Sequence, residues 1–350
     1  MRRCSRRSSL EPELGPAPNR GGHAIGAAAA ALTELEARAV EAGLNGEQFV
    51  HLVLPLLKRL VLLQRGSAQA DQDLSSAMQA PCRSNHHGIH KPIVLLNGPV
   101  GVGKTTLGRT LQLLAPCLGL HLAVASIDDV YFPLAERRRR LAGNPFGVMR
   151  VPPGSHDIGL LMERLQVWRA GSRLRLPRFD KTLVDGQGDR AGETEQSADA
   201  LVLEGWLVGC RALGSDRLAG AMARLEGWNL SEPELEWLPH WDRELEAYEG
   251  LWQSCDGLWL LRPNHWSLPR RWRFQAEARQ RRAGGAWLSP GALDQLVRAS
   301  LHSLPPPLYQ DPLVAGPAAD ANGQLPLLGF TLLDRRRRCL SSQLGELGLG

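Results

Sequence analysis

The stretch GPVGVGKT, which begins at Gly98, combines the residue types that bind the phosphates of a nucleotide. It fits the P-loop pattern, in which four residues separate two glycines and a lysine and a serine or threonine follow. Glycine lacks a Cβ atom, so Gly98, Gly101 and Gly103 let backbone N–H groups curve around an anion. A helix that starts at Lys104 would point its positive N-terminal end at the same anion. We therefore expect a nucleoside triphosphate, with Lys104 near its β- and γ-phosphates and the Thr105 hydroxyl near Mg²⁺.

Two carboxylates follow apolar segments that have the pattern of strands. Asp128 follows residues 121–127, and Glu204 follows residues 201–203. In a doubly wound sheet, ligands lie beyond the carboxyl ends of the strands, so both side chains would face the phosphates. Asp128 is suited to orient a substrate hydroxyl or accept its proton, and Glu204 with Thr105 would offer Mg²⁺ the oxygen ligands that it prefers. The alternatives are an aspartate that caps a loop and an ordinary acid at a strand end.

A strongly basic helix is predicted over residues 268–283. It contains six arginines within LPRRWRFQAEARQRR, and Arg270 and Arg273 are two of them. An arginine above the γ-phosphate stabilises charge in the loose transition state of phosphoryl transfer, and a mobile lid excludes water. We expect this helix to form a lid over about residues 266–284, although a simply exposed basic helix would have the same pattern.

Strand and helix patterns alternate from Lys91 onward, which predicts a parallel sheet with crossover helices. The expected fold class is α/β, with a P-loop NTPase-type parallel sheet flanked by helices. The expected strands are residues 92–96, 121–127, 201–203, 256–261 and, as the last strand, 327–333. The expected helices of this part are residues 104–114 and 160–168. A loop is expected over 185–197 and an irregular segment over 216–249.

Two helices are expected ahead of this sheet, over residues 24–42 and 47–64, with a kink in the second at Pro55. We expect an N-terminal tail, helical extension and polar linker over residues 1–90, and a nucleotide-binding domain over 91–350. The Arg- and Ser-rich first ten residues also have the composition of an organelle transit peptide, but we favour a disordered tip or a misassigned start.

The composition is typical of soluble proteins, with 43% apolar and 22% charged residues in a chain of 350. Because no apolar run approaches about 20 residues, we expect no membrane span. The six cysteines show no CxxC spacing and predict neither a zinc site nor a disulfide framework, which favours a cytoplasmic location. Arginines 2, 3, 6 and 7 supply four charges of the net +5, so we expect no nucleic-acid partner. The oligomeric state is left open.

Five sequence blocks follow the P-loop in a recognisable order. They are SIDDVYF, PPGSHD, PRFDKTLVDGQGDR, LVLEGW and WRFQAE. Together they resemble the D-glycerate 3-kinases of plants and cyanobacteria, a family in the P-loop kinase group with uridine kinase, phosphoribulokinase and bacterial pantothenate kinase. The resemblance covers roughly residues 91–334, which identifies the domain over 91–350 as a P-loop kinase domain.

The resemblance implies which residues handle the nucleotide and the transferred group. The residues expected to bind ATP are Gly98, Gly101, Gly103, Lys104, Thr105 and Thr106. Thr105 and Glu204 would hold Mg²⁺. The residues expected to act in catalysis are Asp128, Lys104, Arg270 and Arg273.

The resemblance also implies an acceptor pocket. Its residues would be His156, Asp157, Arg178, Lys181 and Arg190. A small carboxylate needs cationic partners, and arginine offers a bidentate fork. Which cation binds the carboxylate is left open, and a purely structural role would also suit His156.

The expected function is the ATP-dependent phosphorylation of D-glycerate to 3-phosphoglycerate, which the resemblance links to photorespiration. One alternative is the same chemistry on a nucleoside, a sugar phosphate or pantothenate. Another is a catalytically inactive, ATP-binding regulatory protein. A GTPase switch is disfavoured because no asparagine precedes any of the four lysines, so the chain has no NKxD segment.

Overall fold

The structure, a computed structural model, describes residues 20–66, 84–85, 88–285, 287–315 and 325–345. The predicted N-terminal tail and most of the predicted linker lie outside these residues. None of the helices in the described ranges is long and apolar enough to span a bilayer. The predicted division at residue 90 stays a prediction.

A mostly parallel sheet forms the centre of the molecule and confirms the expected α/β fold. Its strands are β3 (Ile93–Asn97), β4 (Leu122–Ser126), β7 (Ala200–Gly205), β8 (Gly257–Pro263), β9 (Leu327–Leu333) and β10 (Cys339–Leu344). Their order is β10-β9-β8-β3-β7-β4, and the pairs from β9 to β4 are parallel. All five predicted strands are confirmed.

The prediction that residues 327–333 form the last strand is wrong. Strand β10 follows and pairs antiparallel with β9 at the edge of the sheet. Its sequence, CLSSQL, is short, polar and largely exposed, so it lacks the apolar run by which the buried strands were recognised.

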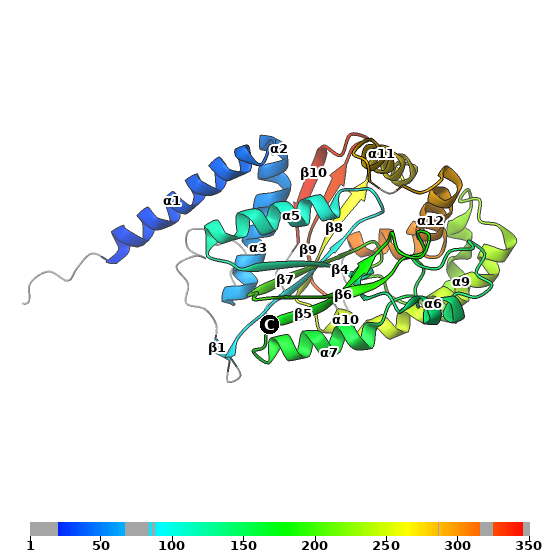
Figure 1. Cartoon of the computed structure of the whole chain (residues 1–350). Coiled ribbons are helices and arrows are strands. Elements are labelled where there is room, and N and C mark those ends of the chain that lie inside the picture. The colour runs from blue at the N-terminus through cyan, green and yellow to red at the C-terminus, as the bar shows by residue number, and fades with distance from the viewer. Residues whose placement is uncertain (1–19, 67–83, 86–87, 286, 316–324, 346–350) are drawn as a thin grey trace, which may run out of the picture.

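Helices cover both faces of this sheet. Helices α3 (Leu54–Arg65) and α5 (Lys104–Leu114) pack on the face that presents Val94 and Leu96 of β3. Helix α7 (Ile158–Arg169) packs on the opposite face, which presents Ile93 and Leu95. Successive side chains of β3 thus point into two separate apolar cores, one on each face of the sheet. Figure 1 shows the sheet between these helices. The predicted helices at 104–114 and 160–168 are confirmed.

The N-terminal helices share the core of the sheet. They are α1 (Arg20–Glu41), α2 (Gly46–Gln48), the π-helical turn η1 (Phe49–Val53) and α3. Pro55 lies in the first turn of α3, directly after the π-helical turn η1. Helix α1 projects from the body in Figure 1, whereas α3 lies against the sheet with Leu56, Leu57 and Leu60 fully buried.

A β-hairpin occupies much of the segment expected to be a loop. Strands β5 (Leu174–Asp180) and β6 (Asp189–Gln196) pair antiparallel, so the loop predicted over 185–197 is wrong except at its start. Strand β6 reads DRAGETEQ and is mostly exposed. Because it has no apolar face, only its pairing with the alternating β5 stabilises it, and that pairing cannot be read from β6 alone.

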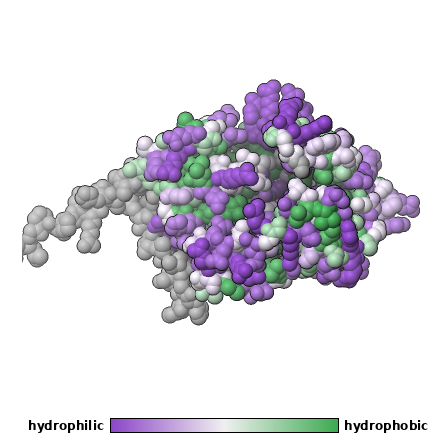
Figure 2. Space-filling view, in the orientation of Figure 1, coloured by the Kyte–Doolittle hydropathy of each residue, from purple (hydrophilic) through white to green (hydrophobic). Residues whose placement is uncertain are grey.

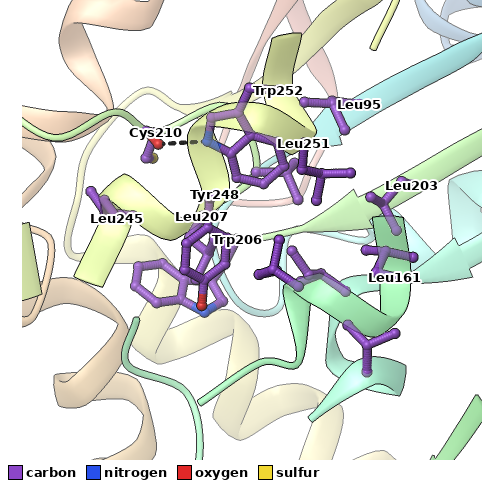
Figure 3. Packing of buried hydrophobic residues seen from close by; sticks show 14 of the residues in the cluster. Leu95, Leu161, Leu203, Trp206, Leu207, Cys210, Leu245, Tyr248, Leu251 and Trp252 are labelled. Atoms are coloured by element: carbon purple, nitrogen blue, oxygen red, sulfur yellow. Dashed lines mark hydrogen bonds between the residues drawn. The ribbon is translucent and has the colours of Figure 1, made fainter. Parts of the chain in front are cut away.

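The Trp-rich segment 216–249 is helical, so the irregular structure expected there is wrong. It contains α8 (Ser215–Ala221), η4 (Met222–Leu225), α9 (Glu232–Glu244) and η5 (Leu245–Tyr248), and α10 (Glu249–Gln253) follows. Trp241 and Trp252 are fully buried, and the indole N–H of Trp252 donates to the carbonyl of Cys210 at 2.9 Å (Figure 3). Burial of large aromatic side chains stabilises helices whose Pro, Trp and His content gives poor intrinsic propensity.

Other short elements complete the described chain. They are β1 (Ser84–Asn85), β2 (Gly88–Ile89), η2 (Ala115–Leu118), η3 (Ile127–Val130), α6 (Leu134–Arg140), α11 (Leu268–Arg282), α12 (Pro290–His302), α13 (Pro306–Tyr309) and η6 (Asp311–Ala315). The basic helix predicted over 268–283 is confirmed as α11.

An ion pair between a buried carboxylate and a partly exposed arginine joins α9 to α12, and its loss is expected to destabilise the fold. Glu234, 2% exposed, accepts from the Nη2 of Arg298 at 2.6 Å and from the backbone N–H of Ser231 at 2.7 Å. Glu234→Gln leaves Arg298 without its countercharge, and we expect the free energy of unfolding to fall by about 1–3 kcal/mol. Urea denaturation measures this. The control is Glu236→Gln, an exposed position on the same helix, and an equal loss in both variants would contradict the prediction.

Candidate active site

The P-loop has the backbone geometry of an anion cradle. Gly101 has a φ of 74° and Gly103 a φ of 110°, conformations that favour glycine. Gly103 is the N-cap of α5, and no side chain caps this helix. The first N–H groups of α5 are therefore available to an anion, and the helix begins at Lys104 as predicted.

Lys104 lies at the centre of this loop. Its Nζ donates to the carbonyl oxygens of Gly98 at 2.7 Å and Pro99 at 3.2 Å. The same Nζ lies 3.9 Å from Oε2 of Glu204. Burial lowers the pKa of Lys104, while Glu204 and Asp128 act in the opposite direction. A buried cation with two carboxylates nearby is suited to partner the oxygens of a phosphate chain.

The side chain of Thr105, in the first turn of α5, contacts that of Glu204, near the end of β7. The Thr105 hydroxyl donates to Oε1 of Glu204 at 2.8 Å, and Glu204 is 6% exposed. The parallel register pairs Leu96 with Glu204, which brings the end of β7 beside the loop that follows β3. A hydroxyl and a carboxylate suit Mg²⁺, which takes few protein ligands and keeps waters or phosphate oxygens. Among the described residues, no group of three or more His, Cys, Asp or Glu side chains is arranged to hold a metal ion.

Asp128 lies at the end of β4 within a network of polar side chains. Its Oδ2 accepts from Nζ of Lys181 at 2.5 Å, and its Oδ1 accepts from the Tyr131 hydroxyl at 2.9 Å. Burial alone would raise the pKa of Asp128, but Lys181 and His156 hold it well below its usual range. Asp128 is thus a carboxylate that stays ionised, as a group that accepts a proton must.

His156 is held in place behind Asp128. It is 3% exposed, its Nδ1 lies 2.7 Å from the Tyr248 hydroxyl, and its ring stacks on Tyr131 with centroids 4.5 Å apart. Its Nε2 is buried without a hydrogen-bond partner in the described structure and lies 3.9 Å from Oδ1 of Asp128. Burial lowers the pKa of His156, which favours the neutral ring. Tyr131 and Tyr248 orient this histidine and were not among the predicted site residues.

Three residues expected in the acceptor pocket lie away from Asp128. Arg190 donates to Oδ2 of Asp157 at 2.8 Å and to the carbonyl of Tyr131 at 3.0 Å. Asp157 also caps α7 by accepting from the backbone N–H of Leu160. Arg178 is exposed on β5. The Arg190–Asp157 pair thus supports the backbone at Tyr131, and of the five expected residues only Lys181 and His156 approach Asp128.

Two buried arginines hold the turn of the β5–β6 hairpin, which carries Lys181. Arg137 donates to the carbonyls of Met149 at 2.6 Å and of Gly188, and Arg150 donates to the carbonyl of Gln187 at 2.8 Å. The guanidinium of Arg137 also lies over the ring of Phe179. In the sequence, Arg137 is the first of four consecutive arginines, and nothing in that run indicates that its side chain is buried.

The basic helix α11 places its two expected catalytic arginines differently. Arg273 lines the cavity and pairs with Oε2 of Glu277 at 2.7 Å. Arg270 is 62% exposed and pairs with Oδ1 of Asp294 at 2.5 Å, so it faces α12. Arg337, within one of the arginine runs, donates to the carbonyl of Gly101 at 2.8 Å and lines the same cavity.

A single cavity of about 520 Å³ joins these groups. Asp128, Lys181 and Glu204 line it together with the P-loop from Val100 to Leu107. Figure 2 shows the surface hollowed beside the hydrophilic side chains of α11. The volume lies within the range of small-molecule sites, about 300–1,000 Å³. The cavity therefore has room for a nucleotide and a small acceptor at adjacent positions.

Comparisons with known proteins agree with this geometry. No family model matches the chain. The D-glycerate 3-kinase of Arabidopsis thaliana, a chloroplastic protein, is 30% identical over 220 residues, 59% of this chain and 45% of that protein. The uncharacterised kinase mug58 of Schizosaccharomyces pombe is 30% identical over 199 residues, 53% of this chain and 70% of that protein. The chain thus spans less than half of the Arabidopsis protein.

A solved structure is also similar. The D-glycerate 3-kinase of Cryptococcus neoformans superposes with a TM-score of 0.66 at 22% identity, covering 84% of this chain and 99% of that one. At this identity the similarity shows a shared fold.

Proposed function

Because the chain belongs to the P-loop kinase family that contains the D-glycerate 3-kinases, we propose that it transfers the γ-phosphoryl group of ATP to the 3-hydroxyl of D-glycerate. The observation that carries the proposal is the shared cavity, in which the P-loop and the Asp128–Lys181 pair lie side by side. A triphosphate on the loop and a hydroxyl at Asp128 would be in position for direct transfer.

Each residue at the cavity has a distinct part in the proposed reaction. Asp128 aligns the 3-hydroxyl and accepts its proton as that oxygen bonds to the γ-phosphorus, while the bond from the γ-phosphorus to the β–γ bridging oxygen breaks and ADP leaves. Lys104 binds the β- and γ-phosphates, and Arg273 adds positive charge at the transferred group. Thr105 and Glu204 would hold Mg²⁺, which neutralises charge on the phosphate oxygens.

The acceptor subsite suits a small anion. Lys181 is 53% exposed and needs only one of its three N–H bonds for Asp128, so it can also bind a carboxylate. His156 is buried behind Asp128, with its Nε2 3.9 Å from Oδ1 of that carboxylate. A cytoplasmic location and a link to photorespiration stay predictions from the sequence.

A coupled assay of ADP release tests the proposal. Purified protein is given Mg-ATP with D-glycerate, L-glycerate, uridine, ribulose 5-phosphate or pantothenate, and the product is identified by mass spectrometry. We expect turnover with D-glycerate and 3-phosphoglycerate as product. Turnover with another acceptor alone would overturn the substrate, and ATP binding without any turnover would favour the regulatory alternative.

The pH dependence of the reaction is expected to depend on Lys181. Its ammonium group helps to keep the pKa of Asp128 low, so Asp128 stays ionised as the pH falls. Lys181→Met removes that charge and is expected to move the acid limb of the kcat/KM profile upward by about one pH unit or more, because Asp128 then protonates at higher pH. Rates between about pH 4 and 8 test this, because the wild-type profile should stay flat down to about pH 4 while the acid limb of the variant should enter that range.

The control for this prediction is Lys58→Met, at a half-buried position on α3 away from the cavity, whose profile should match the wild type. A Lys181→Met enzyme that is slower at every pH with an unmoved acid limb would show that Lys181 acts on the acceptor and not on Asp128.

A further inference from the structure

The N-terminal helices form one wall of the nucleotide cavity. Leu44, Gln48, Leu52 and Val53 line it, although they precede the P-loop by about 50 residues. No motif in this part of the chain predicts a function. Three of the four are apolar, and Gln48 brings a side-chain amide to the same wall.

This wall lies where the nucleoside part of ATP must extend. Asp128 and Lys181 mark the acceptor side of the cavity, so the γ-phosphate points toward them. The cavity continues along α5 past Thr106 to Thr110, which is about 9 Å along the helix axis from Lys104. The turn η1 contacts α5, so we expect the N-terminal wall to lie on the side of the α-phosphate, ribose and base.

The wall is fixed in position by its own packing. Phe49 and Val53 of the π-helical turn η1 are buried in the core shared with the sheet. The side chain of Asn45 caps α2 by accepting from the backbone N–H of Gln48 at 2.8 Å. π-Helical turns are rare in proteins, and those that occur often lie at functional sites.

The chemistry of the wall matches a purine base. Leu44 and Leu52 are half-buried and offer an apolar surface to a flat ring. A glutamine amide carries a donor and an acceptor, the pair that adenine requires along its edge. Gln48 is half-buried at the cavity, and its side chain makes no hydrogen bond to another described residue, so its amide is available for a ligand.

We propose that the α2–η1 segment forms the base subsite for ATP, with Leu44 and Leu52 against the adenine ring and Gln48 hydrogen-bonded to its edge. This rests on the proposed use of ATP. It gives the N-terminal helices a direct role in choosing the nucleotide, separate from their role in the core.

The test compares ligands with and without a base, on the full-length protein. Isothermal titration measures Kd for Mg-ATP and for Mg-tripolyphosphate, which carries the phosphates alone. We expect Leu52→Ala and Gln48→Ala each to weaken ATP binding about tenfold or more while tripolyphosphate binding changes less than about twofold. Gln48→Ala should also reduce the preference for ATP over GTP. The control is Val50→Ala, on the same π-helical turn, 52% exposed and outside the cavity.

Two results would overturn the subsite. Unchanged ATP affinity in both variants would remove its basis, and an equal loss of ATP and tripolyphosphate would place the effect on the P-loop. Both leave the kinase proposal standing if the wild type phosphorylates D-glycerate. A wild-type protein that binds tripolyphosphate as tightly as ATP would overturn the subsite alone, whereas a protein that binds neither would overturn the proposed use of ATP.

Discussion

Asp128→Asn is expected to lower kcat about 10³-fold with little change in the KM for ATP. The amide keeps the size of the side chain and its contact with the Tyr131 hydroxyl, but it cannot accept the acceptor's proton. It also removes the countercharge of Lys181, whose Nζ lies 2.5 Å from Oδ2 of Asp128. Steady-state rates of ADP release with D-glycerate, with ATP varied, measure the effect.

The control is Asp129→Asn at the next residue. Asp129 accepts from the backbone N–H groups of Ser126 and Phe179 and does not line the cavity. We expect its kcat to fall less than about tenfold, since asparagine keeps an acceptor oxygen. If the two variants lose equal activity, the effect comes from the loop that follows β4, and Asp128 is not the catalytic base.

Lys104→Met is expected to lower kcat/KM for ATP by about 10²–10³-fold. Methionine fills a similar volume without the charge, so the β- and γ-phosphates lose their buried cation while Glu204 loses a neighbouring positive charge. ADP-release kinetics give kcat/KM, and titration with Mg-ATP shows how much of the loss is binding.

The same substitution at Lys58 is the matched control. Lys58 lies on α3 outside the cavity, and Lys58→Met should leave kcat/KM for ATP within about twofold of the wild type. A Lys104→Met protein with wild-type kinetics would mean that phosphates do not bind at this loop.

The parts of the site that could be predicted are those set by short stretches of sequence. The P-loop is one continuous segment, and its helix begins at the predicted residue because Gly103 and Lys104 determine that start locally. Asp128 and Glu204 could be placed because parallel strands bring their carboxyl ends to one edge of the sheet. The contact of Thr105 with Glu204 depends on the register between β3 and β7, which the sequence alone does not determine.

The parts that could not be predicted depend on contacts between distant segments. Lys181 reaches Asp128 from a hairpin whose second strand has no apolar pattern. Arg137 is buried although it begins an arginine run, because four backbone carbonyls accept from its guanidinium. Gln48 lies beside the P-loop through packing of η1 on the core, and no local signal marks it.

The contact between the P-loop and α11 limits how the basic helix can move. A Cβ atom on Gly101 would lie 2.7 Å from the backbone N of Arg273, so the two backbones touch, and Arg337 bridges the carbonyls of Gly101 and Trp272. Trp272 is fully buried, which anchors the first turns of the helix. Closure by a hinged flap would break this packing. Because the two backbones touch, a shift of the P-loop on binding phosphate would have to move the start of α11 with it.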